Sequence, residues 1–424
     1  MQNRIVWARL LGLKDAVVED VVLDTDGQIV AHVRPAARQA LRCSRCLRRC
    51  PGYDRGLRRR RWRHLDAGTL MVHLEASTPR VSCPTCGVVT CHIPWARAGT
   101  GHTLDFDHQV AWLATHTSKT ATAALIRIAW RTVGAIVTRV WADIDAVTDR
   151  FANVRRIGID EISYKKGHRY LTIVVDHDSG RLLWAGVGQD AETVDEFFDI
   201  LGPRRCAQIT HVSADAAHWI AKSVRTHCPN AIRCADAFHV VAWATKALDQ
   251  VRRDTWNAAA GRARNSAVTG RNSTGAARAL KTCRWALWKN PEDLTTRQSD
   301  KLAWIAKTDP RLWRAYLLKE GLRHVFKVKG AAGRAALDRW LTWAARCRIP
   351  AFVELASTIK RNRTQIDNAL DHNLSNALIE SMNTKIRQLT RTAYGFTNPE
   401  ALIALALLAH GGYRPQLPGR TTHT

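Results

Sequence analysis

Two Cys-x-x-Cys pairs lie in the first quarter of the chain. They are Cys43 with Cys46 and Cys83 with Cys86. Each pair can fill two corners of a tetrahedron, and four thiolates complete the coordination of a structural Zn²⁺ with no open position. The gap between the pairs is long and must hold a β-hairpin. Three nearby side chains remain alternatives for one of the four ligands: Cys50, Cys91 and His92. We therefore expect one structural zinc ion per chain.

Two aspartates each follow a short apolar segment. Asp160 follows residues 157–159, and Asp215 follows residues 211–214. Both segments are typical of a strand that ends in an acid. Two carboxylates held side by side repel each other unless a cation lies between them. Mg²⁺, or Mn²⁺ in its place, suits such oxygen ligands because it keeps waters and phosphates in its shell.

A site with two metal ions needs a further acid, and residues 375–393 offer Glu380. Apolar side chains recur there at helical spacing and predict one buried seam: Ile379, Met382, Ile386, Leu389 and Ala393. Glu380 lies off this seam, at the head of a polar and basic face that includes Asn383, Arg387 and Arg391. Its early position also puts the carboxylate near the positive end of the helix dipole. Such an acid suits metal binding beside a phosphate backbone.

Three other acids of the same region are weaker candidates. Asp176 and Asp178 precede Ser179-Gly180, which favours a role in a turn. Glu161 alternates to the opposite face of its strand from Asp160. We therefore assign metal binding to none of them.

The elements between residues 155 and 240 must position these acids. Strands are expected at 157–162, 170–175 and 182–187, followed by a helix at 191–201, a strand at 209–214, a helix at 217–226 and a strand at 231–234. This order is typical of an RNase H-like α/β fold. The first and fourth strands of that sheet are parallel neighbours, so their carboxyl ends would bring Asp160 and Asp215 side by side.

The flanking segments follow other periods. Residues 15–35 predict a β-hairpin around Asp26-Gly27, and residues 58–63 and 69–74 a second pair of strands. Residues 109–145 predict three short helices that suggest a helix-turn-helix unit. Its basic side chains are candidates for phosphate contacts: Arg127, Arg131 and Arg139. Residues 240–355 are helical, basic and rich in tryptophan.

The overall charge points to a nucleic-acid partner. The chain has 64 Lys and Arg against 37 Asp and Glu, a net charge of +27, and a pI of about 10.3. A protein this basic usually binds a polyanion, most often nucleic acid. The sequence has no run of 18 apolar residues and no signal peptide, and its 11 cysteines are an odd number. We therefore expect a cytoplasmic protein with neither a membrane partner nor a disulfide framework.

Four motifs resemble the ISL-three family of bacterial insertion-sequence transposases. They are Gly158-Ile159-Asp160-Glu161, Ser213-Ala214-Asp215, Asp236-Ala237-Phe238-His239 and Asn376-Ala377-Leu378-Ile379-Glu380-Ser381-Met382-Asn383. The resemblance covers nearly the whole chain, including the zinc finger and the helix-turn-helix. It implies that Asp160, Asp215 and Glu380 form a DDE triad, and that Asp236 and His239 lie near the active site. It also implies a helical insertion before the glutamate. Ala216 departs from the methionine that often follows the second aspartate in this family.

The resemblance implies a DNA transposase that binds terminal inverted repeats and performs metal-dependent strand cleavage and transfer into target DNA. Work on two double-stranded DNA ends implies a dimer or higher oligomer, associated with the bacterial nucleoid. Two alternatives are an inactive transposase-derived DNA-binding regulator and an RNase H-like nuclease or resolvase. The expected domains are a β-hairpin and zinc finger (1–105), a helix-turn-helix (106–150), the first catalytic part (151–240), a helical insertion (241–355) and the second catalytic part (356–424).

Overall fold

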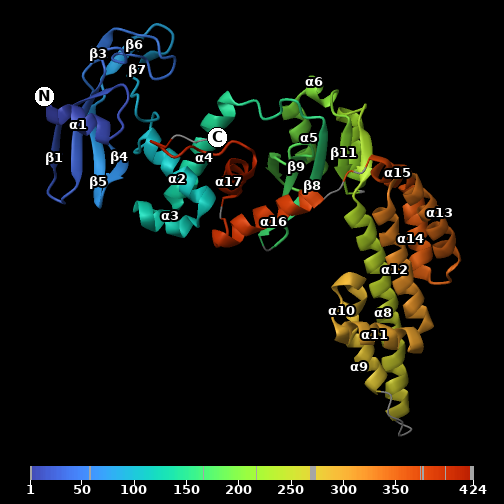
Figure 1. Cartoon of the computed structure of the whole chain (residues 1–424). Helices are drawn as coiled ribbons and strands as arrows, with labels where there is room; N and C mark the ends of the chain where they lie inside the picture. The colour runs from blue at the N-terminus through green and yellow to red at the C-terminus, as the bar shows by residue number, and fades with distance from the viewer. Residues whose placement is uncertain are drawn as a thin grey trace. The chain divides into compact units, whose positions relative to one another are not determined.

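The computed structural model divides the chain into two compact units (Figure 1), Met1–Arg150 with Gln388–Thr424, and Phe151–Arg387. It describes residues 2–56, 59–165, 167–215, 217–267, 274–372, 374, 377–396 and 398–420. Three residues of the predicted motifs lie outside the described residues: Arg58, Ala216 and Asn376. Each unit is described here by itself.

The first unit begins with a short helix, α1 (Gln2–Leu10), and two small sheets. The four-stranded sheet has the order β1-β2-β5-β4, built from β1 (Ala16–Leu23), β2 (Ile29–Pro35), β4 (Arg59–Ala67) and β5 (Leu70–Ser77). Both predicted hairpins are present, since β1 pairs with β2 and β4 with β5 in antiparallel fashion. The second sheet, β3 (Gly52–Asp54), β6 (Arg80–Cys83) and β7 (Gly87–Thr90), carries the second cysteine pair at its edge.

Three helices follow, as the periodicity predicts: α2 (Leu104–His116), α3 (Lys119–Ile126) and α4 (Trp130–Val147). Thr103 and Ser118 begin α2 and α3 by accepting hydrogen bonds from backbone N–H groups of the first turn. Arg127 ends α3 in the left-handed region, with φ of 59°, and α4 turns away by 102°. This angle and the three-residue connection are typical of a helix-turn-helix.

The last helix of the chain, α17 (Pro399–His410), packs against α4 and α2. We expected residues 388–424 in the second catalytic part, but they group with the first unit because of this packing. Among the described residues no single helix is long and apolar enough to cross a membrane, although α3 and α4 pass that test as a bent pair.

The second unit contains a five-stranded sheet with the order β10-β9-β8-β11-β12. Its strands are β8 (Arg156–Lys165), β9 (Arg169–Asp176), β10 (Leu182–Val187), β11 (His211–Ala214) and β12 (Ile232–Ala235). β8, β9 and β10 are antiparallel, whereas β11 runs parallel to both β8 and β12. The order of strands and helices agrees with the prediction, with α5 (Ala191–Leu201), the short α6 (Pro203–Cys206) and α7 (His218–His227) between strands.

One strand differs from expectation. β8 does not end at Asp160 but continues to Lys165, because β9 keeps pairing with it along this extension. Asp160 therefore lies in the middle of β8, at the point where the parallel neighbour β11 stops and the antiparallel neighbour continues. The core beneath this sheet is apolar and includes Ile157, Ile159, Val212 and Phe197 of α5.

The residues expected to form the helical insertion (241–355) lie within a set of packed helices. It runs through α8 (Ala237–Ala267), α9 (Thr274–Thr282), α10 (Arg284–Trp288), α11 (Thr296–Thr308), α12 (Pro310–Val328), α13 (Gly330–Arg346), α14 (Pro350–Arg361) and α15 (Arg363–His372). α8 packs against α12 and α14, and α15 packs against β12. Most tryptophans of this region contact the insertion's own core, whereas Trp285 and Trp343 are exposed.

The helix that carries Glu380, α16 (Ala377–Thr392), lies directly on β8. Its predicted seam is confirmed, since Ile379, Met382 and Ile386 are buried. A Cβ added to Gly158 would lie only 2.2 Å from Ile379 Cδ1. Only a residue without a side chain therefore lets the helix approach the strand this closely.

We predict that Gly158→Ala destabilises the second unit by about 1–3 kcal/mol, because the added methyl group overpacks the contact with Ile379. The midpoint of thermal or urea unfolding measures the change. Ile379→Val removes Cδ1 and should cost less stability in the Gly158→Ala background than in wild type. Gly261→Ala is the control, because a Cβ there meets no atom within 4 Å. Equal stability of wild type and Gly158→Ala would contradict this account.

Candidate functional site

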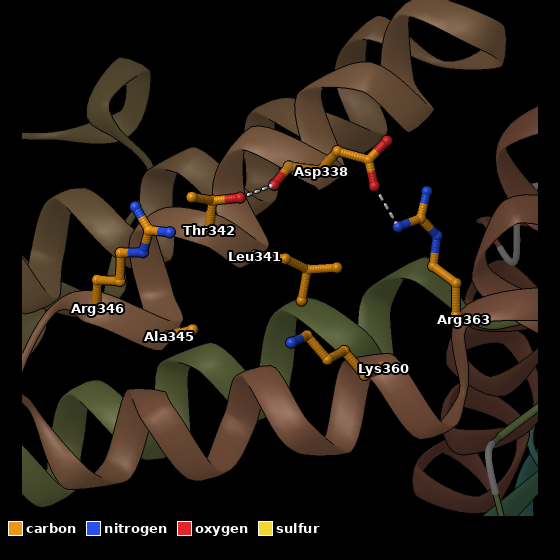
Figure 2. Close-up of a pocket in the computed structure, with 7 residues that line it drawn as sticks. All are labelled: Asp338, Leu341, Thr342, Ala345, Arg346, Lys360 and Arg363. Atoms are coloured by element: carbon orange, nitrogen blue, oxygen red, sulfur yellow. Dashed lines mark hydrogen bonds and ion pairs between the residues drawn. The ribbon is translucent and has the colours of Figure 1, made fainter.

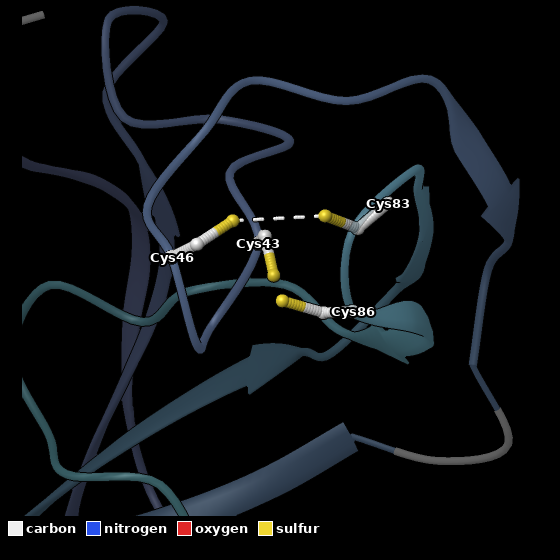
Figure 3. A group of neighbouring side chains, drawn as sticks. All are labelled: Cys43, Cys46, Cys83 and Cys86. Atoms are coloured by element: carbon white, nitrogen blue, oxygen red, sulfur yellow. Dashed lines mark hydrogen bonds between the residues drawn. The ribbon is translucent and has the colours of Figure 1, made fainter.

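The four predicted zinc ligands form one cluster (Figure 3). The Sγ atoms of Cys43, Cys46, Cys83 and Cys86 all lie within 4.8 Å of one another, and Cys46 Sγ is 3.6 Å from Cys83 Sγ. A tetrahedral zinc with Zn–S bonds of about 2.3 Å holds its sulfurs about 3.8 Å apart. The cluster therefore has the size and the donor set that a structural zinc requires.

The local backbone favours the thiolate forms of Cys43 and Cys83, whereas burial and the neighbouring thiols raise the pKa of Cys86 to about 12. Burial opposes ionisation of the Cys83 thiol. The N–H groups of Thr85 and Cys86 stabilise its thiolate, and the net effect lowers the pKa of Cys83 to about 6. The N–H of Arg45 also donates to Cys43 Sγ at 3.4 Å. The thiolate is the form that binds metal.

The three alternative zinc ligands lie outside the cluster. Cys91 forms a β-bridge with Cys43 through the backbone, and Cys50 Sγ donates to the carbonyl of Arg48 at 3.4 Å. The backbone N–H of His92 donates to the carbonyl of Arg42 at 2.6 Å. The four cysteines of the two Cys-x-x-Cys pairs are therefore sufficient as a ligand set.

Asp160 and Asp215 occupy matching positions on neighbouring parallel strands. Ser213 of β11 lies opposite Gly158 of β8, and each aspartate follows two residues later. Burial raises the pKa of Asp160, and the negative charge of Asp215 raises it further. The strand register and the raised pKa of Asp160 therefore both agree with the predicted proximity of these two acids.

Asp236 and His239 complete this side of the site. Asp236 directly follows β12, is 3% exposed, and accepts a hydrogen bond from the N–H of Phe238 at 2.8 Å, which caps the start of α8. The ring of His239 lies between two carboxylates, with Nδ1 3.4 Å from Asp215 Oδ2 and Nε2 3.5 Å from Asp236 Oδ2. Hydrogen bonding to Asp215 and these nearby charges raise the pKa of His239 to about 9. The carboxylates on both sides of the ring therefore favour the protonated form of His239.

α16 adds Glu380 and Asn383 from the far end of the chain. Burial raises the pKa of Glu380, and the charges of Asp236 and Asp160 raise it further. One turn later, Asn383 Nδ2 donates to Asp160 Oδ2 at 2.7 Å, and Asn383 is 5% exposed. Among the described residues, the acids are less tightly grouped than the cysteines, whose ligand atoms all lie within 4.8 Å.

Glu161 lies closer to the site than its strand alternation suggested. Burial, Asp160 and Asp215 raise its pKa to about 7, and its Oε1 atom is buried without a hydrogen-bond partner. Asp176 and Asp178 behave as expected of turn residues. Asp176 accepts hydrogen bonds from the N–H groups of Asp178 and Ser179, and Asp178 pairs with Arg156.

The basic side chains predicted to contact DNA fall into two groups. Arg139 donates to both oxygens of the buried Asp107, at 2.6 and 2.9 Å, and Arg127 pairs with Asp66. Each of these two arginines therefore joins two elements of the first unit. The others are exposed: Arg131 in the first turn of α4, and Arg387 and Arg391 on α16.

Sequence reasoning assigned no specific contact to two residues of the site. Asn383 follows Glu380 by three residues, a spacing that places both on one helix face. Phe238 lies inside the Asp-x-x-His motif and is 60% exposed, which is unusual for a large aromatic ring. Only the fold reveals that Asn383 reaches Asp160.

Comparison with known proteins gives a consistent result for all three parts of the chain. The ISL3 transposase family matches residues 157–406, the helix-turn-helix domain of transposase family ISL3 matches residues 91–141, and the zinc finger of the IS204, IS1001, IS1096 and IS1165 transposases matches residues 39–90. The chain is 61% identical to the transposase for insertion sequence element IS1557 of Mycobacterium tuberculosis, over 100% of this chain and 99% of that protein. It is 27% identical to the transposase for insertion sequence element IS1001 of Bordetella parapertussis, over 87% and 88% of the two chains.

We predict that the purified protein contains about one zinc ion per chain, and that Cys43→Ser and Cys83→Ser lose it. Each substitution removes one of four thiolates, and a structural zinc contributes free energy to folding of the finger. Elemental analysis measures the metal content, and limited proteolysis measures the order of residues 39–90. Cys50→Ser is the matched control, because Cys50 is buried nearby but lies outside the cluster. Zinc-free wild-type protein would rule out this site.

Proposed function

The chain belongs to the ISL3 family of transposases, and we propose that Asp160, Asp215 and Glu380 are the acids of its DDE catalytic domain. The observation that carries this proposal is the attachment of α16 to β8 at the acids, through the Asn383–Asp160 hydrogen bond of 2.7 Å. The charge of Asp160 raises the pKa of Glu380, which supports their proximity. As a DDE transposase, the protein cleaves and transfers DNA strands.

We assign an RNase H-like fold to the catalytic domain. The support is the strand order, in which the third, second and first strands are antiparallel and the fourth and fifth continue in parallel beside the first. This arrangement puts the end of β11 next to the middle of β8, with β12 on the other side of β11. Ligands of α/β sheets bind at the carboxyl ends of parallel strands.

We propose that Asp160, Asp215 and Glu380 hold Mg²⁺, or Mn²⁺ in its place. The donor set consists of carboxylates, which Mg²⁺ prefers. Glu161 Oε1 and Asn383 Oδ1 are buried oxygens without hydrogen-bond partners, so further oxygen donors face this region. When bound, the metal supplies Lewis-acid activation of the attacking oxygen and stabilises the leaving oxygen of the phosphodiester.

The remaining polar residues of the site position the acids. Asn383 fixes one oxygen of Asp160, while the N–H of Glu161 donates to the other at 2.8 Å. His239 contacts Asp215 and Asp236 from a single ring and offsets part of their mutual repulsion. Because partners of metal-binding carboxylates set their orientation, we assign a positioning role to Asn383, His239 and Asp236.

We propose that the zinc finger and the helix-turn-helix recognise the terminal inverted repeats. In such units the second helix enters the major groove with its N-terminal residues at base edges. That helix is α4, and Arg131 occupies its first turn and is exposed. Arg387 and Arg391 are proposed phosphate contacts. Joining two DNA ends to target DNA requires at least a dimer, and we place the protein in the bacterial cytoplasm at the nucleoid.

The triad is tested by Asp160→Asn, Asp215→Asn and Glu380→Gln. Each change keeps the size of the side chain and removes one negative charge, so each should abolish cleavage and joining of element-end DNA in Mg²⁺. Binding of that DNA should stay the same or become slightly tighter, because a charge that repels the backbone is gone. Gel assays of cleavage, joining and binding measure the three properties separately.

Asp178→Asn is the control for these variants. Asp178 is an exposed acid that pairs with Arg156, and losing such a pair costs little. This variant should remain active. Near-wild-type cleavage by Glu380→Gln would show that another acid completes the site, with Glu354 and Glu400 next to test. Cleavage without joining by wild type would favour a nuclease.

The positioning role of Asn383 gives a different signature. Asn383→Ala frees one oxygen of Asp160, and loss of such a partner typically lowers metal affinity or activity about 10- to 100-fold. We expect a higher Mg²⁺ concentration for half-maximal cleavage, with unchanged DNA affinity. Thr384→Ala is the matched control, since Thr384 is the exposed neighbour on the same helix. An unchanged Mg²⁺ requirement in Asn383→Ala would remove this role.

A further inference from the structure

A cleft of 760 Å³ runs along α8 and α12 in the helical insertion. Its apolar lining includes three aromatic side chains, Phe238, Trp288 and Phe326. Its charged lining consists of one acid, Asp249, and four basic side chains: Lys246, Arg253, Arg323 and Lys327. The proposed DDE chemistry uses none of these residues.

The cleft begins at the acids. Phe238 is 60% exposed, and its chain neighbour His239 contacts Asp215 and Asp236. The N–H of Phe238 itself donates to Asp236. A buried carboxylate thus holds the backbone that carries this exposed ring, at the first turn of α8 and beside the proposed catalytic acids.

Deeper in the cleft, Trp288 offers both an aromatic face and a donor. Its ring packs against the core of the insertion, and its Nε1 atom is buried without a hydrogen-bond partner. The guanidinium of Arg284 lies 3.8 Å from the centre of the ring. Because Trp288 lines the cleft, its ring is a second aromatic surface on which a flat ring can stack.

A second hollow among the described residues of the insertion has a different character (Figure 2). It lies between α13 and α14, and its cations are Arg346, Lys360 and Arg363. None of its lining residues is aromatic, and Arg363 pairs with Asp338 at its edge. That hollow suits a phosphate alone, whereas the cleft along α8 combines cations with stacking surfaces.

We propose that the cleft receives an unpaired nucleobase of the DNA strand that the acids cleave. Each base has a flat π-face that stacks on aromatic side chains, and basic residues attract the adjoining phosphates. In a duplex both faces of a base are covered by its neighbours, so the base must leave the stack to enter. This proposal depends on the proposed catalytic acids in one respect only: their position determines which nucleotide of the DNA lies beside the cleft.

The cations of the cleft fit this occupant. Arg253 shares Asp249, and Lys327 shares Glu292, whereas Lys246 is exposed on α8 on the same side of the helix as the cleft. Arg323 also lines the cleft, but it pairs with Glu292 and Glu320. Lys246 and Arg253, which is 55% exposed, are therefore the cations best placed to meet a backbone phosphate. The apolar interior then selects the base rather than the phosphate.

The test compares affinities of the full-length protein for three probes, without added Mg²⁺, by fluorescence anisotropy. One probe is a blunt 20-base-pair duplex, the second carries a three-nucleotide thymine overhang, and the third carries an abasic overhang of equal length. We expect wild type to prefer the thymine overhang over the abasic one. Phe238→Ala should lose about five- to one-hundredfold in affinity for the thymine probe. It should leave affinity for the blunt and abasic probes unchanged.

Two further variants sharpen the result. Trp288→Phe keeps stacking but removes the indole N–H, so it should lose less than Phe238→Ala. Trp343→Ala is the control, because Trp343 is an exposed aromatic residue of the same insertion that does not line the cleft. Asp160→Asn should keep the preference of wild type for the thymine overhang over the abasic one, which separates this cleft from the catalytic assignment. Equal affinity of wild type for thymine and abasic overhangs, or an equal loss in Trp343→Ala, would overturn the proposal.

Discussion

The close contact between α16 and β8 is the constraint on which the active site depends. Gly158 presents bare backbone to Ile379, so the helix axis comes nearer to the strand than any side chain would allow. The residue after Ile379 is Glu380, and the next turn brings Asn383 to Asp160, 223 residues away in sequence. The absence of a Cβ at Gly158 thus determines where Glu380 lies. It also determines where the side chain of Asn383, which donates to Asp160, lies. The buried seam of α16 supplies the apolar contact that holds this approach.

The acids themselves oppose this arrangement. Asp160, Glu161 and Glu380 each have a raised pKa because burial and neighbouring carboxylates disfavour their charged forms. Buried like charges destabilise a fold unless a cation offsets them. His239, with its pKa raised to about 9, offsets part of this repulsion. The apolar core under the sheet and the large core of the insertion supply the stability that such a site removes.

Much of the architecture follows from local patterns. The apolar runs predicted every strand of the catalytic sheet, the 3.6-residue seam predicted the burial of α16, and spacing predicted the cysteine cluster. Contacts distant in sequence were not predictable in this way. β8 continues past Asp160 because β9 pairs with it. Arg139 forms an ion pair with a buried aspartate of another helix, Asp107. Residues 388–424 group with the first unit because α17 packs against α4 and α2. The sequence of α17 carries no pattern that predicts these partners.

The start of α8 links the acids to the helical insertion. Asp236 directly follows the last strand of the sheet and caps the helix, and the first turn of that helix carries His239 toward Asp215. Phe238, from the same turn, lines the cleft between α8 and α12. Side chains of adjacent residues on a helix point in different directions, so one turn can serve both places. The insertion that separates Asp215 from Glu380 in sequence is therefore more than a connection. Its first helix is positioned by an acid of the active site, and any shift of α8 would move His239 and the cleft together.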